Sequence, residues 1–91
     1  MSIKGQVVVI TGGTGSLGSV VTARFARAGA RVAVTYRNPA EWEALQAVLA
    51  EPDQVLGLQC DVGVEAQVEA AFAQVQEKLG EPQVLLNLAG G

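Results

Sequence analysis

The alternation of apolar and polar residues along the chain predicts four strands separated by three helices. Short, continuous apolar runs are typical of strands buried on both faces, and they occur at 6–11, 31–36, 55–60 and 83–89. Between these runs, apolar residues recur every three or four positions at 17–28, from Pro39 to Pro52, and at 64–79. Because a helix joins each strand to the next, the pattern is typical of an α/β protein.

Residues at the helix ends support these boundaries to different degrees. The second helix has a clear start, because Asn38 can cap it and Pro39 suits the first helical position. Glu41 stands three residues after that cap, as in a capping box. The third helix has a weak start, since Gly63 stands where Ser or Thr would cap better. Gly80 follows this helix as a stop signal.

Right-handed crossovers wind a βαβαβαβ chain into one parallel sheet. We therefore expect residues 1–91 to form a single domain with a Rossmann-type, doubly wound sheet of strand order 3-2-1-4, truncated after the fourth strand. The strand order reverses between the first and fourth strands. Ligands bind outside the carboxyl ends of the strands at such a switch point, so we expect segments 12–18 and 87–91 to meet there.

The first strand runs directly into a glycine-rich turn. Four of the seven residues at 12–18 are glycines: Gly12, Gly13, Gly15 and Gly18. A strand, a glycine-rich turn and a helix N-terminus in this order form a phosphate site, because the first helical N–H groups point at the anion. A tight turn without a ligand is the alternative. The entropic cost of four glycines makes it the weaker interpretation.

The turn fits two glycine patterns and excludes a third. Gly13, Gly15 and Gly18 satisfy G-x-G-x-x-G, which binds dinucleotides when it follows a strand and opens a helix. Gly12, with Gly15 and Gly18, instead satisfies T-G-x-x-G-x-x-G after a threonine. A Walker A loop is excluded, because residues 19–20 are Ser-Val in place of Lys and Ser/Thr.

The end of the second strand indicates which dinucleotide binds. A free ribose 2′-hydroxyl usually meets an acid about twenty residues beyond the glycines, but residues 35–38 are Thr-Tyr-Arg-Asn and the first acid is Glu41. Arg37 is instead placed to pair with a 2′-phosphate. We therefore expect NADP as the preferred cofactor, with NAD possible. A solvated Arg37 without a ligand is the alternative. The missing acid also disfavours a nucleoside-binding methyltransferase.

Two further strand ends carry polar residues. Asp61 and Val62 follow the third strand, and Asp61 either accepts a hydrogen bond from an adenine amino group or caps the next helix. The sequence leaves both alternatives open. Residues 87–90, Asn-Leu-Ala-Gly, end the fourth strand at the switch point.

These motifs, in this order, resemble the N-terminal part of a short-chain dehydrogenase/reductase, and in particular a 3-oxoacyl-ACP reductase. The resemblance covers the whole chain and implies hydride transfer between NADP(H) and a carbonyl or alcohol. It implies a cofactor-binding set of Gly12, Thr14, Gly15, Ser16, Leu17, Gly18, Tyr36, Arg37, Asn38, Asp61, Val62, Asn87, Ala89 and Gly90. It also implies that Asn87 stabilises the central sheet and that the backbone of Ala89 and Gly90 lies against the cofactor ribose.

The chain departs from this family in three respects. Ser16 stands where the family has the second glycine of its turn, with Gly15 one residue earlier, a spacing similar to the epimerase-like branch. Leu88 replaces the second asparagine of the fourth-strand motif N-N-A-G. The family's catalytic Ser and Tyr-x-x-x-Lys find no match, since the only tyrosine, Tyr36, is followed four residues later by Ala40. We assign no catalytic residue and expect no activity from this chain alone. A non-catalytic half-domain that binds a nucleotide or a partner is the alternative function.

Charge and cysteine content narrow the partners. The chain has six basic and nine acidic residues, a net charge of −3 and no run of Lys or Arg, so we expect no nucleic-acid or membrane partner. Its apolar runs are all shorter than a membrane span, and we expect no secretory signal. The lack of histidine excludes His-containing metal sites, and we expect no metal. Cys60, the only cysteine, is expected to be a buried residue in a reducing, cytoplasmic compartment.

The fourth strand indicates how the domain associates. Residues 84–86, Val-Leu-Leu, are strongly apolar and would form an unpaired edge of the predicted sheet. We therefore expect either a homo-oligomer or dependence on a missing C-terminal portion.

Overall fold

The computed structural model describes residues 3–88. Within this range the elements, in chain order, are β1 (Val7–Thr11), α1 (Ser16–Arg27), β2 (Arg31–Tyr36), α2 (Pro39–Val48), the 3₁₀ turn η1 (Pro52–Gln54), β3 (Val55–Gln59), α3 (Glu65–Lys78) and β4 (Val84–Asn87). The alternation predicted from the apolar pattern is confirmed.

One helix end differs from the prediction. The helix expected to reach Pro52 ends at Val48, and Leu49 is already extended, with φ −79° and ψ 137°. Pro52 lacks an N–H and keeps the residue before it out of the helical region, so the helix cannot extend as far as Pro52. The buried side chain of Leu49 joins the apolar core beside Leu45.

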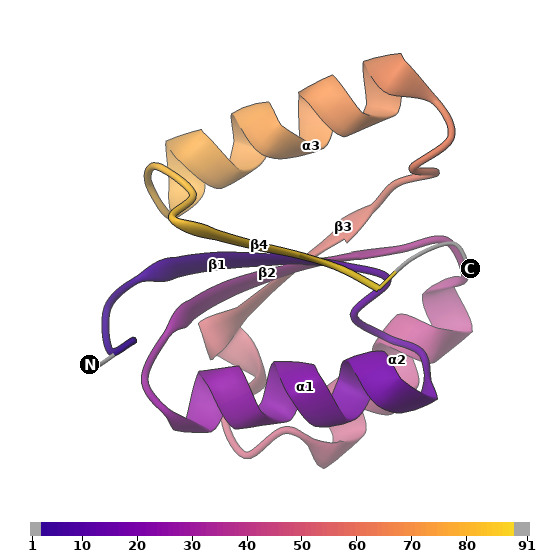
Figure 1. The fold of residues 1–91 in the computed structure, drawn as a ribbon. Helices are drawn as coiled ribbons and strands as arrows, with labels where there is room; N and C mark the ends of the chain where they lie inside the picture. The colour runs from indigo at the N-terminus through magenta and orange to yellow at the C-terminus, as the bar shows by residue number, and fades with distance from the viewer. Residues whose placement is uncertain (1–2, 89–91) are drawn as a thin grey trace.

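The four strands form one parallel sheet in the order β3-β2-β1-β4, as predicted. Val8 in β1 lies beside Val32 in β2 on one side and Val84 in β4 on the other. Helices α1 and α2 cover one face of the sheet, and α3 covers the other (Figure 1). The carboxyl ends of the strands, where β1 passes into the glycine turn, lie at one end of this three-layer arrangement.

Alternate residues of β1 supply the cores on the two faces. Val8 and Ile10 pack against the α1 and α2 side, whereas Val7 and Val9 pack against the α3 side. Successive strand side chains point to opposite faces, so burial on both faces requires every position of β1 to be apolar or nearly so. This packing explains the unbroken run of apolar residues and fixes where β1 ends.

The face under α3 is incompletely covered at β4. Leu85 has 56% of its surface exposed and lies beside Val9, on the α3 face. A hollow of about 250 Å³ opens beside it, lined by Thr11, Val62, Val68, Phe72, Leu85 and Asn87. Among the described residues, α3 therefore covers this face of the sheet only partly at β4.

Candidate functional site

The glycine turn is built by steric constraints at three of its four glycines. Gly12 has φ +71°, a conformation that side chains disfavour. A Cβ atom on Gly18 would overlap the carbonyl oxygen of Gly12 and lie 2.8 Å from the carbonyl carbon of Gly13. A Cβ atom on Gly13 would lie 2.6 Å from Val34 Cγ1. The turn therefore lies directly against β2 and against the first turn of α1.

Gly15 differs from the other three glycines. A Cβ atom there would have no heavy atom within 4 Å, and its φ of −70° is open to any residue. Both glycine patterns proposed from the sequence include Gly15, so neither coincides with the sterically constrained set. The set is Gly12, Gly13 and Gly18. The open space at Gly15 faces the cavity described below, which leaves room for a ligand.

Two hydroxyl groups fix the turn. The N–H of Gly12 donates to Thr35 Oγ1 at 3.1 Å, and Thr22 Oγ1 donates to the carbonyl oxygen of Gly13 at 3.0 Å. Both threonines are buried, with Thr22 fully inaccessible. The turn is thereby anchored to the end of β2 and to the inner face of α1, so its shape is set before any ligand arrives.

The N-terminus of α1 is open toward an anion. The helix begins at Ser16, and no side chain within the described range caps it or places an acid in its first turn. The first N–H groups of a helix have no intrahelical partner, and the helix dipole places partial positive charge on them. Leu17, in the same turn, has 65% of its surface exposed. The arrangement suits a phosphate or pyrophosphate group.

A cavity of about 260 Å³ extends from this turn across the carboxyl ends of β2 and β3. It is lined by Gly12, Thr14, Gly15, Thr35, Tyr36, Arg37, Asn38, Glu41, Cys60 and Val62. Seven of these ten belong to the predicted set. Thr35 and Cys60 were not predicted as lining residues, and Glu41 was noted only as a helix-start residue. The topology thus brings residues from three separate segments, 12–15, 35–41 and 60–62, into one wall.

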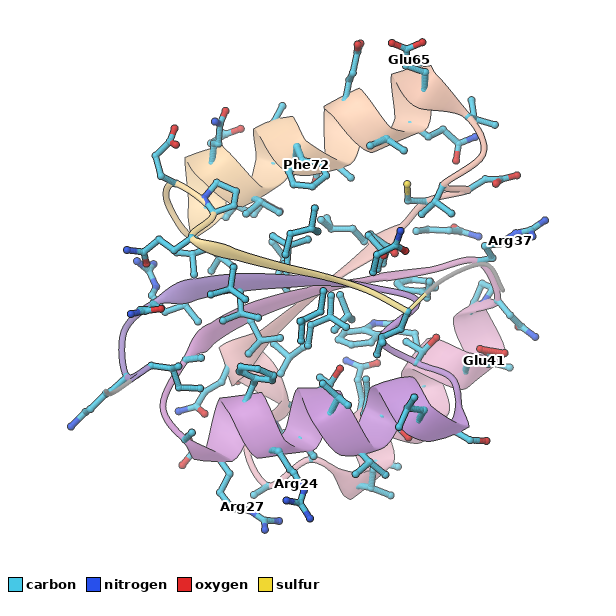
Figure 2. All side chains as sticks on the ribbon, viewed as in Figure 1. Arg24, Arg27, Arg37, Glu41, Glu65 and Phe72 are labelled. Atoms are coloured by element: carbon cyan, nitrogen blue, oxygen red, sulfur yellow. The ribbon has the colours of Figure 1, made fainter. Side chains whose placement is uncertain are left out.

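The positive charge of the cavity comes from Arg37, whose side chain is 75% exposed. Its guanidinium lies 3.8 Å from Asp61 Oδ2, at the limit of an ion pair. Figure 2 shows the labelled Arg37 and Glu41 side chains at the same end of the sheet, on the right. Since exposed pairs of this kind contribute about 0–1 kcal/mol, Arg37 is free to turn toward another anion.

Asp61 organises the loop before α3 and does not cap that helix. Its Oδ1 accepts a hydrogen bond from the N–H of Gly63 at 2.9 Å, and its own N–H donates to Gln67 Oε1 at 2.8 Å. Val64 occupies the cap position of α3 without a side-chain cap bond, which confirms the weak start. The alternative that Asp61 caps α3 is therefore wrong. Its contact with an adenine amino group stays a prediction.

An aromatic pair supports the base of the cavity. Tyr36, at the end of β2, stacks on Trp42 with ring centroids 5.6 Å apart and planes inclined by 6°. Gly57 in β3 provides the space, because a Cβ atom there would overlap the Trp42 indole. Asn38 Oδ1 accepts from the N–H of Ala40 at 2.9 Å, which confirms its expected helix cap.

The fourth strand is joined to the first by a side-chain hydrogen bond. Thr11 Oγ1 donates to Asn87 Oδ1 at 2.8 Å, and the N–H of Leu88 donates to the Thr11 carbonyl at 2.9 Å. Asn87 does not line the 260 Å³ cavity; it lines the hollow beside Leu85. Ala89 and Gly90, which belong to the predicted set, lie outside the described residues.

Cys60 is buried at the end of β3, with 1% of its surface exposed. Burial raises the pKa of its thiol, and the charge of neighbouring Asp61 raises it further. The group is therefore a protonated thiol at neutral pH, as expected of a packing residue.

Among residues 3–88, no three His, Cys, Asp or Glu side chains are grouped to bind a metal. None of the described helices has the length and apolarity to cross a membrane.

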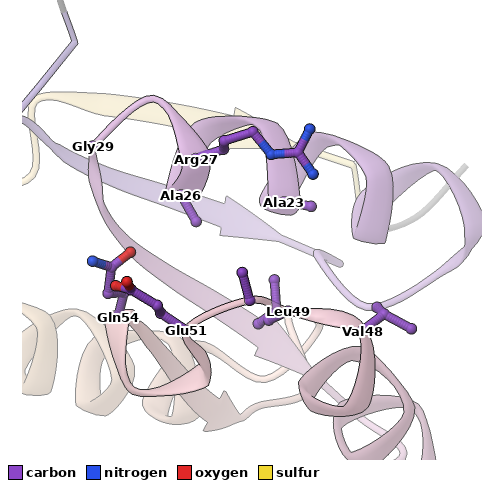
Figure 3. A pocket seen from close by; sticks show the side chains of 9 residues that line it. Ala23, Ala26, Arg27, Gly29, Val48, Leu49, Glu51 and Gln54 are labelled. Atoms are coloured by element: carbon purple, nitrogen blue, oxygen red, sulfur yellow. The ribbon is translucent and has the colours of Figure 1, made fainter.

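A second cavity, of about 280 Å³, lies between the C-terminal ends of α1 and α2 (Figure 3). Ala26 and Leu49 form its apolar part, and Arg27 and Glu51 stand at its edges. The segments that follow these helices lead into the amino ends of β2 and β3. This cavity therefore lies at the opposite end of the sheet from the glycine turn, and none of the predicted site residues lines it.

Known proteins are similar to this chain in both sequence and fold. The short chain dehydrogenase family model matches residues 6–91. An uncharacterized oxidoreductase of Schizosaccharomyces pombe is 36% identical over 91 residues, covering 99% of this chain and 32% of that protein. The chain spans about a third of the length of the curated relatives it matches.

Solved structures give the same result. A short chain dehydrogenase from Bacillus anthracis has a TM-score of 0.90 and 35% identity, covering 99% of this chain and 36% of that one. A 3-ketoacyl-(acyl-carrier-protein) reductase from Brucella melitensis, complexed with NADH, has a TM-score of 0.83 and 32% identity, covering 92% and 34%. The resemblance inferred from the motifs is confirmed. With a Rossmann-type sheet and a family match over 6–91, the chain belongs to the short-chain dehydrogenases, a family of oxidoreductases.

Proposed function

We propose that this chain binds a nicotinamide dinucleotide, preferentially NADP(H), at the carboxyl ends of β1, β2 and β3. It would serve an oxidoreductase that moves hydride between this cofactor and a carbonyl or alcohol. The observation that carries the proposal is the 260 Å³ cavity, which joins the glycine turn to Arg37 in one continuous wall. The Brucella melitensis reductase, which is similar over 92% of this chain, is complexed with NADH and supports a nicotinamide dinucleotide as the ligand.

The residues present fit the pyrophosphate and adenosine parts of the cofactor. The uncapped N-terminus of α1, with Gly15 open beside it, suits the pyrophosphate. A side chain at Gly13 would push the turn away from β2, and one at Gly18 would push it away from the first turn of α1. Val62 and the aromatic ring of Tyr36 offer apolar surface to the adenosine. When bound, the cofactor supplies the hydride, and the chain binds and orients it. We propose no catalytic residue within residues 3–88.

The preference for NADP rests on Arg37. Arg37 lines the cavity, and within residues 3–88 its guanidinium has a single ion-pair contact, at 3.8 Å to Asp61. A 2′-phosphate would offer it a closer, charge-assisted and bidentate partner. The contact between Asp61 and an adenine amino group, and the contacts of Asn87, Ala89 and Gly90 near the ribose, remain proposals. A cytoplasmic location is supported by the single, buried cysteine, which has no second cysteine in this chain to form a disulfide with.

Trp42 provides the binding assay. It is the only tryptophan and stacks on Tyr36, which lines the cavity, so bound reduced nicotinamide dinucleotide should quench its emission. We expect NADPH to bind more tightly than NADH. Arg37→Ala should weaken NADPH binding by about tenfold or more, from the loss of a charge-assisted hydrogen bond, and change NADH binding by less than about twofold.

Arg24→Ala is the matched control. It removes the same charge from the solvent side of α1, and Figure 2 shows Arg24 far from Arg37. The control should leave both affinities unchanged. Equal affinity of the wild type for NADPH and NADH would contradict the 2′-phosphate assignment, as would equal effects of the two arginine substitutions.

A further inference from the structure

Glu41 occupies an unexpected place, since it lines the same cavity as Arg37. Its carboxylate Oε2 accepts a hydrogen bond at 3.2 Å from Oγ1 of Thr14, a residue of the glycine turn that is only 9% exposed. The carboxylate is therefore held between the first turn of α2 and the glycine turn, and the cap made by Asn38 fixes where that helical turn begins. The sequence does not predict this contact, because residues 14 and 41 are far apart along the chain.

We propose that Glu41 is a specificity-determining residue. It weakens binding of the 2′-phosphate and so lowers the ratio of the affinity for NADP to the affinity for NAD. The proposal rests on the proposed function, because it assumes that the adenosine ribose lies in this cavity. Glu41 would accept a hydrogen bond from an unphosphorylated ribose hydroxyl and would repel a phosphate at the same position.

The charges around the cavity support this role. Arg37 is the single cation among the lining residues, and Glu41 is the single carboxylate. Asp61, which does not line this cavity, contacts Arg37 at 3.8 Å. Arg37, Glu41 and Asp61 together therefore carry a net charge of about −1. A 2′-phosphate of about −1.5 to −2 charge gains from Arg37 but is repelled by this surplus.

A purely structural role is the competing explanation for Glu41, because its hydrogen bond joins α2 to the glycine turn. Glu41→Gln separates the two roles. The amide oxygen of glutamine can still accept from Thr14, whereas the negative charge is lost. Glu43→Gln is the matched control: it makes the same charge change on the same helix, at an exposed residue that does not line the cavity.

The test is calorimetric titration of the chain with NADP⁺ and NAD⁺, using wild type, Glu41→Gln, Glu43→Gln and Arg37→Ala. We expect Glu41→Gln to raise the NADP⁺ to NAD⁺ affinity ratio about fivefold at low salt, with the gain shrinking as salt screens the charges. Glu43→Gln should leave the ratio within about 1.5-fold of wild type. Circular dichroism checks that each variant retains the fold.

Each outcome of these titrations has a defined meaning. An unchanged ratio in Glu41→Gln, or an equal rise in Glu43→Gln, overturns the role of Glu41. A ratio that rises in Glu41→Gln but is insensitive to Arg37→Ala overturns the Arg37 assignment and leaves Glu41 as the determinant. If neither dinucleotide binds the wild-type chain saturably, the proposed function fails, and with it this inference.

Discussion

Substitution of Gly18 by alanine tests how the glycine turn is built. In the structure, a Cβ atom at this position would overlap the Gly12 carbonyl oxygen and lie 2.8 Å from the carbonyl carbon and 2.9 Å from the Cα atom of Gly13. All three neighbours are backbone atoms, so no side chain can rotate away. The turn and the first turn of α1 must separate for the variant to fold.

The expected magnitude combines two opposing effects. Overpacking against immobile atoms costs about 1–3 kcal/mol. Alanine is more favourable than glycine in a helix by about 0.5–1 kcal/mol, because an alanine residue loses less conformational entropy when the chain folds. We therefore expect Gly18→Ala to lower the free energy of unfolding by about 1–2 kcal/mol. For a domain of this size, each kcal/mol corresponds to about 4–8 °C in Tm.

Gly15→Ala is the control within the same turn, since a Cβ atom there meets nothing within 4 Å. Its φ of −70° suits alanine, although glycine is the better cap, so the two effects should cancel within about 0.5 kcal/mol. Urea unfolding followed by circular dichroism measures both variants. If Gly18→Ala proves as stable as Gly15→Ala, the steric account of the turn is refuted.

Three further predictions concern other parts of the fold. Thr11→Val should lower the free energy of unfolding by about 1 kcal/mol, because it removes the 2.8 Å hydrogen bond to Asn87. A double-mutant cycle with Asn87→Ala should show a coupling energy of about 0.5–1.5 kcal/mol. Additive effects of the two substitutions would show that this hydrogen bond does not stabilise the fold. Because the folded-state pKa of Cys60 is raised, the stability from its protonated form is present below the ordinary thiol pKa and lost as pH rises through the folded value. Wild type should therefore lose stability relative to Cys60→Ala above about pH 8.5, and parallel pH profiles would contradict this. Sedimentation velocity at high concentration should show that the chain self-associates. Leu85→Lys should reduce this association, whereas Val48→Lys, an exposed residue of α2 on the other face of the sheet, should not. A monodisperse wild-type monomer would contradict association through β4.

Local patterns in the sequence are sufficient to predict most of the fold. The apolar run in β1 reports burial on two faces, and the glycine turn that follows it marks where the strand ends. Asn38 and Pro39 mark the start of α2 because capping depends only on nearby residues. The strand order follows from the Rossmann-type pattern of a glycine turn after the first strand, together with right-handed crossovers.

Contacts between distant segments are the part that the sequence does not predict. Nothing near Glu41 indicates that its carboxylate meets Thr14, because the contact depends on how α2 packs beside the glycine turn. The hydrogen bonds of Asp61 likewise involve a glutamine side chain in α3. The roles of the glycines in the turn depend on atoms of β2 and α1, so pattern matching gave Gly15 the same weight as Gly18.

The most direct test of the central claim is amide chemical-shift mapping of the chain with NADP⁺ by nuclear magnetic resonance. The proposed site predicts the largest shifts at 12–18 and 35–38 and at Val62, which together form the glycine turn and the cavity wall. Segments 26–29 and 48–51, which border the cavity between α1 and α2, should remain unchanged. Shifts confined to those two segments, or no saturable shift at the glycine turn, would contradict dinucleotide binding at the carboxyl ends of the strands.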